Sequence, residues 1–122
     1  MKRCLFVDDS AVVRRVAKRI LGGPDFDVLE AATGAEGVAA CAIDMPDIIV
    51  VDGALPDMAA TEFIRRVRDI AGPVKPQIAI CLTELDIAAI MRAKRAGAQG
   101  YLLKPFDRPQ LLGRLNDLTD GA

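Results

Sequence analysis

The sequence predicts an α/β fold in which five parallel strands form one sheet and five helices cover it. Short apolar, β-rich runs alternate with helical patterns along the whole chain, which is typical of β-α-β units. The run at 48–51 is entirely apolar and β-branched, as in strands that are covered on both faces. Glycine and proline punctuate these segments, and neither a repeat nor a low-complexity stretch interrupts them. We therefore expect a single domain over residues 1–122.

The first half of the chain contains three predicted strands and two helices. A strand at 3–7 is followed by a helix at 10–21, which Gly22, Gly23 and Pro24 bring to an end. The strand at 27–31 is short and mixed in polarity, which is typical of a sheet edge, and a helix of small residues follows at 33–42. The strand at 48–51 ends in Asp52. The apolar residues of the first helix recur at intervals of three and four: Val12, Val13, Val16, Ala17 and Ile20.

The second half contains two further strands and three helices. A loop at 53–60 leads into a helix at 61–70, with Phe63, Ile64 and Val67 on its inner face. The strand at 78–82 leads to a helix at 86–96, which a glycine terminates. The strand at 101–103 reaches a Lys-Pro pair, and the last helix is expected at 108–118. This last helix is expected to bury four leucines: Leu111, Leu112, Leu115 and Leu118.

Composition excludes several classes of function. With 16 basic and 17 acidic residues the net charge is -1, so the chain lacks the positive field that drives direct nucleic-acid binding. The apolar run near the N-terminus is too short for a secretory signal or a membrane span, so we expect a cytoplasmic protein with no membrane partner. The absence of histidine rules out histidine acid/base catalysis and a phosphohistidine carrier. Three cysteines at 4, 41 and 81 lack metal-binding spacing and are expected to be buried, reduced thiols.

Polar side chains follow four of the five predicted strands. Asp8 and Asp9 follow the first, Asp52 the third, Thr83 the fourth and Lys104 the fifth. Right-handed crossovers place the carboxyl ends of parallel strands at one edge of the sheet, where ligands bind in such folds. Three carboxylates repel one another unless a cation intervenes, and oxygen ligands favour Mg2+. A hydroxyl and a lysine are the groups that a transferring phosphoryl group needs, so this edge suits a phosphorylated carboxylate.

Each of these residues also has a purely structural interpretation. Asp8 or Asp9 could cap the helix expected at 10–21, and Thr83 could cap the helix expected at 86–96. Asp52 could be a turn residue and Lys104 a solvated loop lysine. The coincidence of all of them at successive strand ends favours the functional interpretation.

Four segments carry a family resemblance over essentially the whole chain. They are LFVDDS at 5–10, IIVVDGALP at 48–56, AICLT at 79–83 and GYLLKPF at 100–106. Together they resemble the receiver domains of bacterial two-component response regulators, above all the single-domain, chemotaxis type. The resemblance implies a doubly wound, flavodoxin-like sheet with strand order 2-1-3-4-5.

The resemblance also implies roles for the strand-end residues. Asp52 would accept a phosphoryl group from the phosphohistidine of a histidine kinase or phosphotransfer protein. Asp8, Asp9 and Asp52, with the backbone carbonyl of Ala54, would hold Mg2+. Thr83 would bind a phosphoryl oxygen. The chain would act as a phosphoryl acceptor and not as a multiple-turnover enzyme.

Three more roles follow from the resemblance. Lys104 would bind another phosphoryl oxygen, and Pro105 would be a cis-proline that aims it into the site. Tyr101 would be the aromatic switch that turns as Thr83 moves. Phosphorylation would then shift the conformation of a surface formed by residues 86–96, 101–103 and 108–118, which a downstream protein reads. We expect that surface to contain Ala88, Met91, Arg92, Arg95, Tyr101 and Arg108, although its arginines could equally be only a solvated face.

The chain departs from the family pattern at a few positions. Ala59-Ala60 replaces the usual Asp-Gly, which implies a differently shaped loop because alanine resists positive φ. Glu84 follows Thr83 where a small residue is usual, and we expect it to point outward. Ala54 and Leu85 cannot orient water by hydrogen bonds, so we expect a long-lived phosphorylated state.

Other functions remain open at this point. A pseudo-receiver would keep the fold but bind its partner independently of phosphate. A Mg2+-dependent phosphohydrolase would need a substrate-enclosing cap that the chain lacks. A flavin or nucleotide carrier would need glycines where the first loop has DDSAV.

Overall fold

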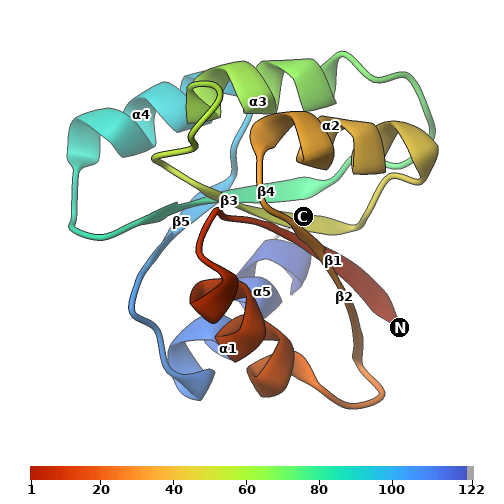
Figure 1. The fold of residues 1–122 in the computed structure, drawn as a ribbon, viewed down its shortest axis with the longest axis vertical. Helices are drawn as coiled ribbons and strands as arrows, with labels where there is room; N and C mark the ends of the chain where they lie inside the picture. The colour runs from red at the N-terminus through yellow and green to blue at the C-terminus, as the bar shows by residue number, and fades with distance from the viewer. Residues whose placement is uncertain (121–122) are drawn as a thin grey trace.

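The fold is a parallel five-stranded sheet between two layers of helices. In the computed structural model, which describes residues 1–120, the strand order is β2-β1-β3-β4-β5 and every neighbouring pair is parallel. Helices α2, α3 and α4 cover one face, and α1 and α5 cover the other (Figure 1). The predicted α/β class and strand order are confirmed. Residues 121–122, the last two of the predicted domain, lie outside the described residues.

The elements alternate regularly along the chain. The strands are β1 (Lys2–Val7), β2 (Phe26–Ala31), β3 (Ile48–Asp52), β4 (Gln77–Leu82) and β5 (Gly100–Leu103). The helices are α1 (Ala11–Leu21), α2 (Gly34–Ile43), α3 (Ala60–Arg68), α4 (Ile87–Ala96) and α5 (Arg108–Asp120). The short, mixed strand β2 is at the sheet edge, as its sequence predicted.

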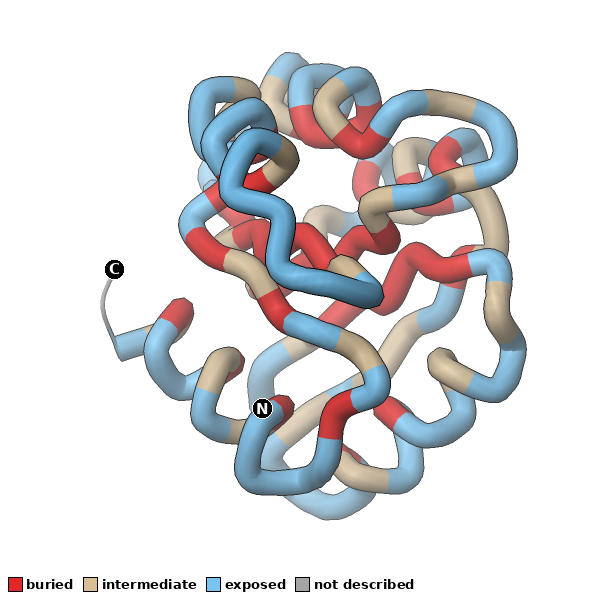
Figure 2. The backbone as a smooth tube through the Cα atoms, turned by 90° about the vertical axis from the view of Figure 1, so that its left-hand side faces the viewer, coloured by how far each residue is buried: buried red, intermediate tan, exposed pale blue. Residues whose placement is uncertain are grey.

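Two hydrophobic cores lie on opposite faces of the central strands. Alternation along β3 sends Ile49 and Val51 to the core beneath α2, α3 and α4, and Ile48 and Val50 to the core beneath α1 and α5. All five residues of β3 are buried, and Figure 2 shows buried backbone concentrated in the middle of the molecule. The centre of the sheet is therefore a rigid platform for whatever its strand ends carry.

Three helices begin one residue later than predicted, because the predicted first residue is the N-cap. Ser10, Thr33 and Asp86 each have extended backbone, and each side chain accepts a hydrogen bond from the backbone N–H three residues further on. Because Ser10 caps α1 and Asp86 caps α4, neither Asp8, Asp9 nor Thr83 is a helix cap. α3 begins at Ala60, whose preceding N-cap residue Ala59 offers no side-chain hydrogen bond.

The outer surface of α1 differs from the periodicity prediction. Ala17 and Leu21 are buried, but Val12 is 63% exposed and Val16 is 41% exposed. The apolar stripe of α1 is wider than the groove that receives it, so the two valines lie at its open side. Leu112 of α5 is likewise only half-buried, unlike the other three predicted leucines.

Within residues 1–120, none of the helices combines the length and the apolar character needed to cross a bilayer.

Candidate functional site

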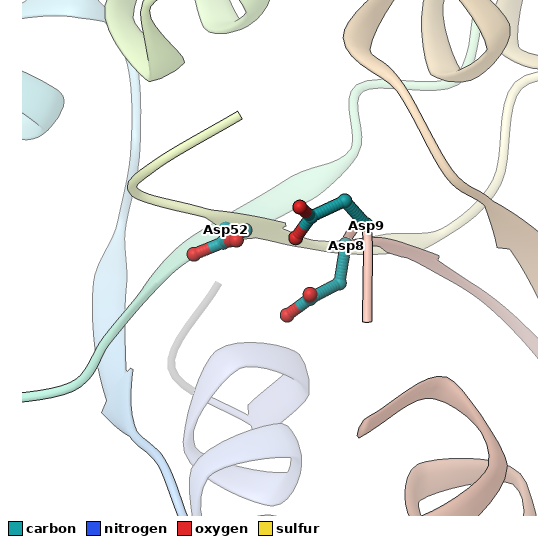
Figure 3. A group of neighbouring side chains, drawn as sticks. All are labelled: Asp8, Asp9 and Asp52. Carbon is teal, nitrogen blue, oxygen red and sulfur yellow. The ribbon is translucent and has the colours of Figure 1, made fainter. Parts of the chain in front are cut away.

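Three aspartates meet at the carboxyl end of the sheet. β1 and β3 are neighbours, so the residues that end them, Asp8 and Asp52, lie side by side. Asp8 and Asp52 are buried and Asp9 is exposed, and one carboxylate oxygen from each lies within 4.8 Å of the others (Figure 3). Such a cluster of oxygen donors is suited to a hard cation, and it could bind a metal ion.

Lys104 reaches two of these carboxylates from the end of β5. Its Nζ atom donates to Asp8 Oδ2 at 2.9 Å and lies 3.1 Å from Asp52 Oδ1. The Lys104-Pro105 peptide bond is cis, as the resemblance predicted. Four of the predicted polar residues, from three strand ends, are therefore brought together.

The ammonium group of Lys104 is stabilised by these contacts. Burial alone would lower its pKa, but the hydrogen bonds to Asp8 and Asp52 outweigh that effect, so the pKa of Lys104 is raised above 10.5. The lysine therefore carries its positive charge throughout the physiological range. Its charge offsets only one of the three carboxylates.

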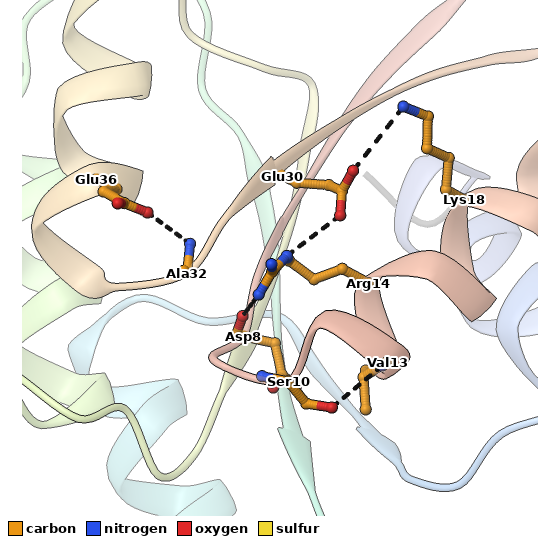
Figure 4. Close-up of polar contacts among 8 residues, drawn as sticks. All are labelled: Asp8, Ser10, Val13, Arg14, Lys18, Glu30, Ala32 and Glu36. Atoms are coloured by element: carbon orange, nitrogen blue, oxygen red, sulfur yellow. Dashed lines mark hydrogen bonds and ion pairs between the residues drawn. The ribbon is translucent and has the colours of Figure 1, made fainter.

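A polar network behind the cluster holds the first loop. Asp8 Oδ1 accepts a hydrogen bond from the Ser10 N–H at 2.9 Å, and the Arg14 guanidinium donates to the carbonyl oxygen of Asp8. Arg14 Nε also pairs with Oε1 of Glu30 in β2 at 3.2 Å. The other carboxylate oxygen of Glu30 lies 3.9 Å from Lys18 Nζ (Figure 4). Neighbouring strand and helix therefore fix both the backbone and the side chain of Asp8.

An open cavity of about 480 Å³ lies over the cluster. Thr83 lines it together with Asp9, Asp52 and Lys104, so the fourth strand contributes its predicted residue as well. Ala54 also lines it, and its N–H donates to Asp52 Oδ1 at 3.2 Å. The full lining is Asp9, Asp52, Gly53, Ala54, Cys81, Leu82, Thr83, Asp86, Ala89, Arg92 and Lys104.

The loop after β3 lies directly against β4. The Gly53 N–H donates to the Cys81 carbonyl at 2.8 Å, and a Cβ on Gly53 would approach Leu82 Cδ2 to 2.6 Å, so a larger residue would displace the end of the Leu82 side chain. Ala59 enters α3 with φ -67°, and no non-glycine residue in 1–120 has positive φ. The loop through the alanine pair therefore contains no left-handed residue.

Asp57 anchors this loop to α2, a role that the sequence did not indicate. Its two carboxylate oxygens accept hydrogen bonds from the N–H groups of Gly34 and Ala35, both at 2.9 Å. These N–H donors, Ala35 first and then Gly34, lower the pKa of Asp57. The contact joins residues more than twenty positions apart, so no local pattern could reveal it.

The residues at the α4 side of the cavity are much more exposed. Thr83, Glu84 and Leu85 are all exposed, and Glu84 does not line the cavity, as expected for an outward side chain. Tyr101 is half-buried, and the Arg114 guanidinium carbon lies 4.8 Å from the centre of its ring. Of the two predicted switch residues, Thr83 is therefore exposed, whereas Tyr101 packs partly against the core beneath α2, α3 and α4.

Two of the predicted surface residues lie elsewhere. Arg92 lines the site cavity and a second cavity beside α3, on the flank of α4 away from β5. Arg108 donates to the Ile20 carbonyl at 2.9 Å, at the end of α1. Helical spacing alone did not decide which flank of its helix each long side chain follows.

The three cysteines are buried and free, as predicted. Burial raises the pKa of Cys41 to about 11 and that of Cys81 to about 12. Although Cys81 borders the cavity, its thiol is therefore not a nucleophile at neutral pH.

The sequence, the fold and the site agree with one family. Residues 4–116 match the model of the response regulator receiver domain, and the chain belongs to this family. It is 31% identical over 119 residues to chemotaxis protein CheY of Thermotoga maritima, covering 97% of this chain and 98% of the relative. It is 30% identical to Protein PilH of Pseudomonas aeruginosa, covering 99% of this chain and all of the relative.

Solved structures support the same assignment. Chemotaxis response regulator CheY4 of Vibrio cholerae superimposes with a TM-score of 0.84 at 28% identity, covering 97% of this chain and 98% of that one. A CheY-like receiver domain protein of Methanospirillum hungatei gives a TM-score of 0.88 at 26% identity, covering 99% and 95%. The chain is thus a receiver domain of the CheY-like type.

Proposed function

We propose that this chain accepts a phosphoryl group on Asp52, from the phosphohistidine of a histidine kinase or phosphotransfer protein, in a Mg2+-dependent reaction. One observation carries the proposal. Asp52 is buried at a strand end with Lys104 Nζ 3.1 Å from its Oδ1 atom, and two further carboxylates adjoin it. Family membership supplies the general mechanism, which is phosphorylation on an aspartate.

The charge of the cluster supports a divalent ion. Three carboxylates and one ammonium give a formal charge of 1 - 3 = -2. Asp8, Asp9 and Asp52, with the carbonyl of Ala54, would hold Mg2+, which neutralises phosphoryl oxygens when bound. Oxygen-only ligands and an open cavity suit Mg2+ because it retains several waters.

The transfer balances with this chain acting as the nucleophile. A carboxylate oxygen of Asp52 forms a bond to phosphorus while the phosphorus–nitrogen bond of the donor breaks. The nitrogen keeps the bonding electron pair, and the donor imidazole takes up a proton from solvent. Lys104 and the Thr83 hydroxyl bind phosphoryl oxygens in the product. The chain is consumed as a stoichiometric acceptor, so it is not a multiple-turnover enzyme.

The output would be a change in the α4-β5-α5 face. Thr83 lies in the loop that leads into α4, and Tyr101 lies in β5, so movement of Thr83 toward a phosphoryl oxygen alters both. This face exposes Ile87, Met91 and Leu103, which are 62%, 45% and 38% exposed. An apolar surface of this kind is suited to a downstream protein partner.

Direct phosphorylation tests the proposal. The protein is incubated with acetyl phosphate and Mg2+, and intact mass spectrometry follows the addition of one phosphoryl group. We expect incorporation that requires Mg2+ and is absent from Asp52→Asn. Incorporation that survives Asp52→Asn, or none in the wild-type protein, contradicts the proposal.

The same variant addresses the alternative function. A phosphorylation-independent pseudo-receiver predicts that Asp52→Asn binds a downstream partner as the phosphorylated wild-type protein does. Under our proposal, acetyl phosphate strengthens partner binding by the wild-type protein and leaves binding by Asp52→Asn unchanged.

A further inference from the structure

Arg92 is a cation at the site that the receiver mechanism does not use. It lies in the second turn of α4, and it lines both the cavity above Asp52 and an adjoining cavity of about 150 Å³. The smaller cavity lies between the start of α3 and the first half of α4. Gly53, Ala60, Ala89 and Arg92 are among the residues that line it.

The position of Arg92 follows from helix geometry. Asp86, Ala89 and Arg92 are spaced by three residues, so they share one flank of α4, and all three line the site cavity. A long side chain on a helix leans toward the N-terminus, which here is the end nearest to Thr83. The small side chain of Ala89 and the absence of one at Gly53 leave this path open.

Arg92 has no fixed acidic partner in the described part of the chain. Lys104, Arg14, Arg3 and Arg114 each lie within 4.0 Å of a carboxylate, whereas Arg92 does not. The acid that shares its cavity, Asp86, accepts a hydrogen bond from the Ala89 N–H at 3.0 Å as the N-cap of α4. The exposed Arg92 guanidinium is therefore free to pair with a new anion at the site.

Phosphorylation creates such an anion. Conversion of a carboxylate into an acyl phosphate changes the formal charge at Asp52 from -1 to roughly -2, and it adds acceptor oxygens that project into the cavity. Lys104 and a divalent ion together offset the charge of the unphosphorylated cluster. One extra negative charge then remains, and Arg92 is the other basic residue that lines this cavity.

We propose that Arg92 binds the phosphoryl group on Asp52 and thereby holds α4 against the site in the phosphorylated state. The inference rests on the phosphorylation of Asp52 proposed above. It adds a second contact through which the phosphoryl group acts on α4. Thr83 acts through the loop before α4, whereas Arg92 acts on the helix itself. Arg92 leaves the flank that carries Met91 free, so the same helix can bind phosphate on one flank and a partner on the other.

A beryllofluoride titration tests this role. The 15N-labelled protein is titrated with beryllium fluoride in the presence of Mg2+, and amide chemical shifts report the affinity and the response of α4. Arg92→Gln is compared with Arg92→Lys and with Lys94→Gln, which removes one exposed positive charge from the same helix but lines neither cavity. The unliganded spectra show whether each variant keeps the fold.

We expect Arg92→Gln to weaken beryllofluoride affinity by roughly two- to fivefold, the range for a partly exposed charge pair, and to reduce the shifts along α4. Arg92→Lys should keep most of the affinity, and Lys94→Gln should match the wild-type protein. The difference between Arg92→Gln and the wild-type protein should shrink as salt is added.

The possible failures are distinguishable. If the wild-type protein binds beryllofluoride next to Asp52 and Arg92→Gln binds equally well with unchanged α4 shifts, the role of Arg92 is overturned and phosphorylation stands. An equal loss of affinity in Lys94→Gln also overturns it, because the effect would then come from the overall positive charge of α4 and not from a contact of Arg92. If the wild-type protein itself shows no response near Asp52, the proposed function and this inference fail together.

Discussion

The two sides of the site differ in how firmly their residues are held. On the β1-β3 side, Asp8 and Asp52 are buried and share one lysine, and Arg14 and Ser10 fix the Asp8 loop. On the α4 side, the loop from Thr83 to Asp86 is exposed, and Tyr101 is only half-buried. The first side is preorganised for charge, whereas the second is more exposed to solvent. A receiver requires both properties, because its chemistry must be the same in every molecule while its surface must exist in two states.

Removal of Lys104 should break the preorganised side and have the largest effect. Lys104→Met leaves Asp8 and Asp52 without their shared cation, so the free energy of unfolding should fall by about 3 kcal/mol. Urea unfolding measures this change, and added Mg2+ should restore part of it. The initial rate of phosphorylation by acetyl phosphate should fall roughly a hundredfold.

The pH dependence gives a check on the same residue. Because the pKa of Lys104 is raised in the folded state, its contribution is complete below the unfolded pKa of about 10.5 and is lost as the pH rises through the folded pKa. The stability difference between wild-type protein and Lys104→Met should therefore be constant from neutral pH to about pH 10. A difference that disappears near pH 7 contradicts the ion-pair geometry.

The lifetime of the phosphorylated state sharpens the comparison, because one apolar residue from each side, Ala54 or Leu85, can be replaced by a polar one. Ala54 and the exposed Leu85 cannot hydrogen-bond an attacking water, so dephosphorylation of the purified protein should be slow. The double variant Ala54→Asn, Leu85→Glu should lose its phosphoryl group roughly tenfold faster, less than full general-base catalysis contributes. Decay is followed by intact mass spectrometry after removal of the donor, and equal rates would refute the idea.

Asp57 tests how the loop after Asp52 is anchored. Asp57→Ala removes the acceptor for the Gly34 and Ala35 N–H groups, so the free energy of unfolding at neutral pH should decrease. The folded pKa of Asp57 is lowered below 3.8, so this contribution is present above that value and is lost as the pH falls through the folded pKa. Unfolding measured between pH 7 and pH 2 checks both statements. Asp25→Ala, which removes another exposed carboxylate, should show a smaller effect.

The smallest effect should come from the contact at the edge of β5. Arg114→Gln removes a guanidinium that lies 4.8 Å from the centre of the Tyr101 ring, and it should lower stability by about 0.5 kcal/mol. The same substitution in a Tyr101→Leu background should cost less, and the difference between the two measures the contact. Equal losses in both backgrounds would show that Arg114 does not restrain Tyr101.

The fold and the centre of the site could be predicted because their signals are local. Alternating strand and helix periods indicated a parallel sheet, and such sheets carry their ligands at the carboxyl ends of the strands. That rule selected Asp8, Asp9, Asp52, Thr83 and Lys104. The predicted start of a helix was one residue too early where the preceding residue is its N-cap, as at Ser10, because the sequence pattern does not separate the cap from the first helical residue.

Sequence alone therefore determined which residues reach the edge of the sheet and what chemistry they offer together. Tertiary structure decided which of them touch: Lys104 lies between Asp8 and Asp52 although 96 positions separate it from Asp8. It also decided that Asp57 binds the start of α2 and that Arg92 follows the flank of α4 next to the site. Periodicity reports which way a residue faces within its own element. The direction of a long side chain and the distance between two loops depend on how the elements pack, and no short stretch of sequence encodes that packing.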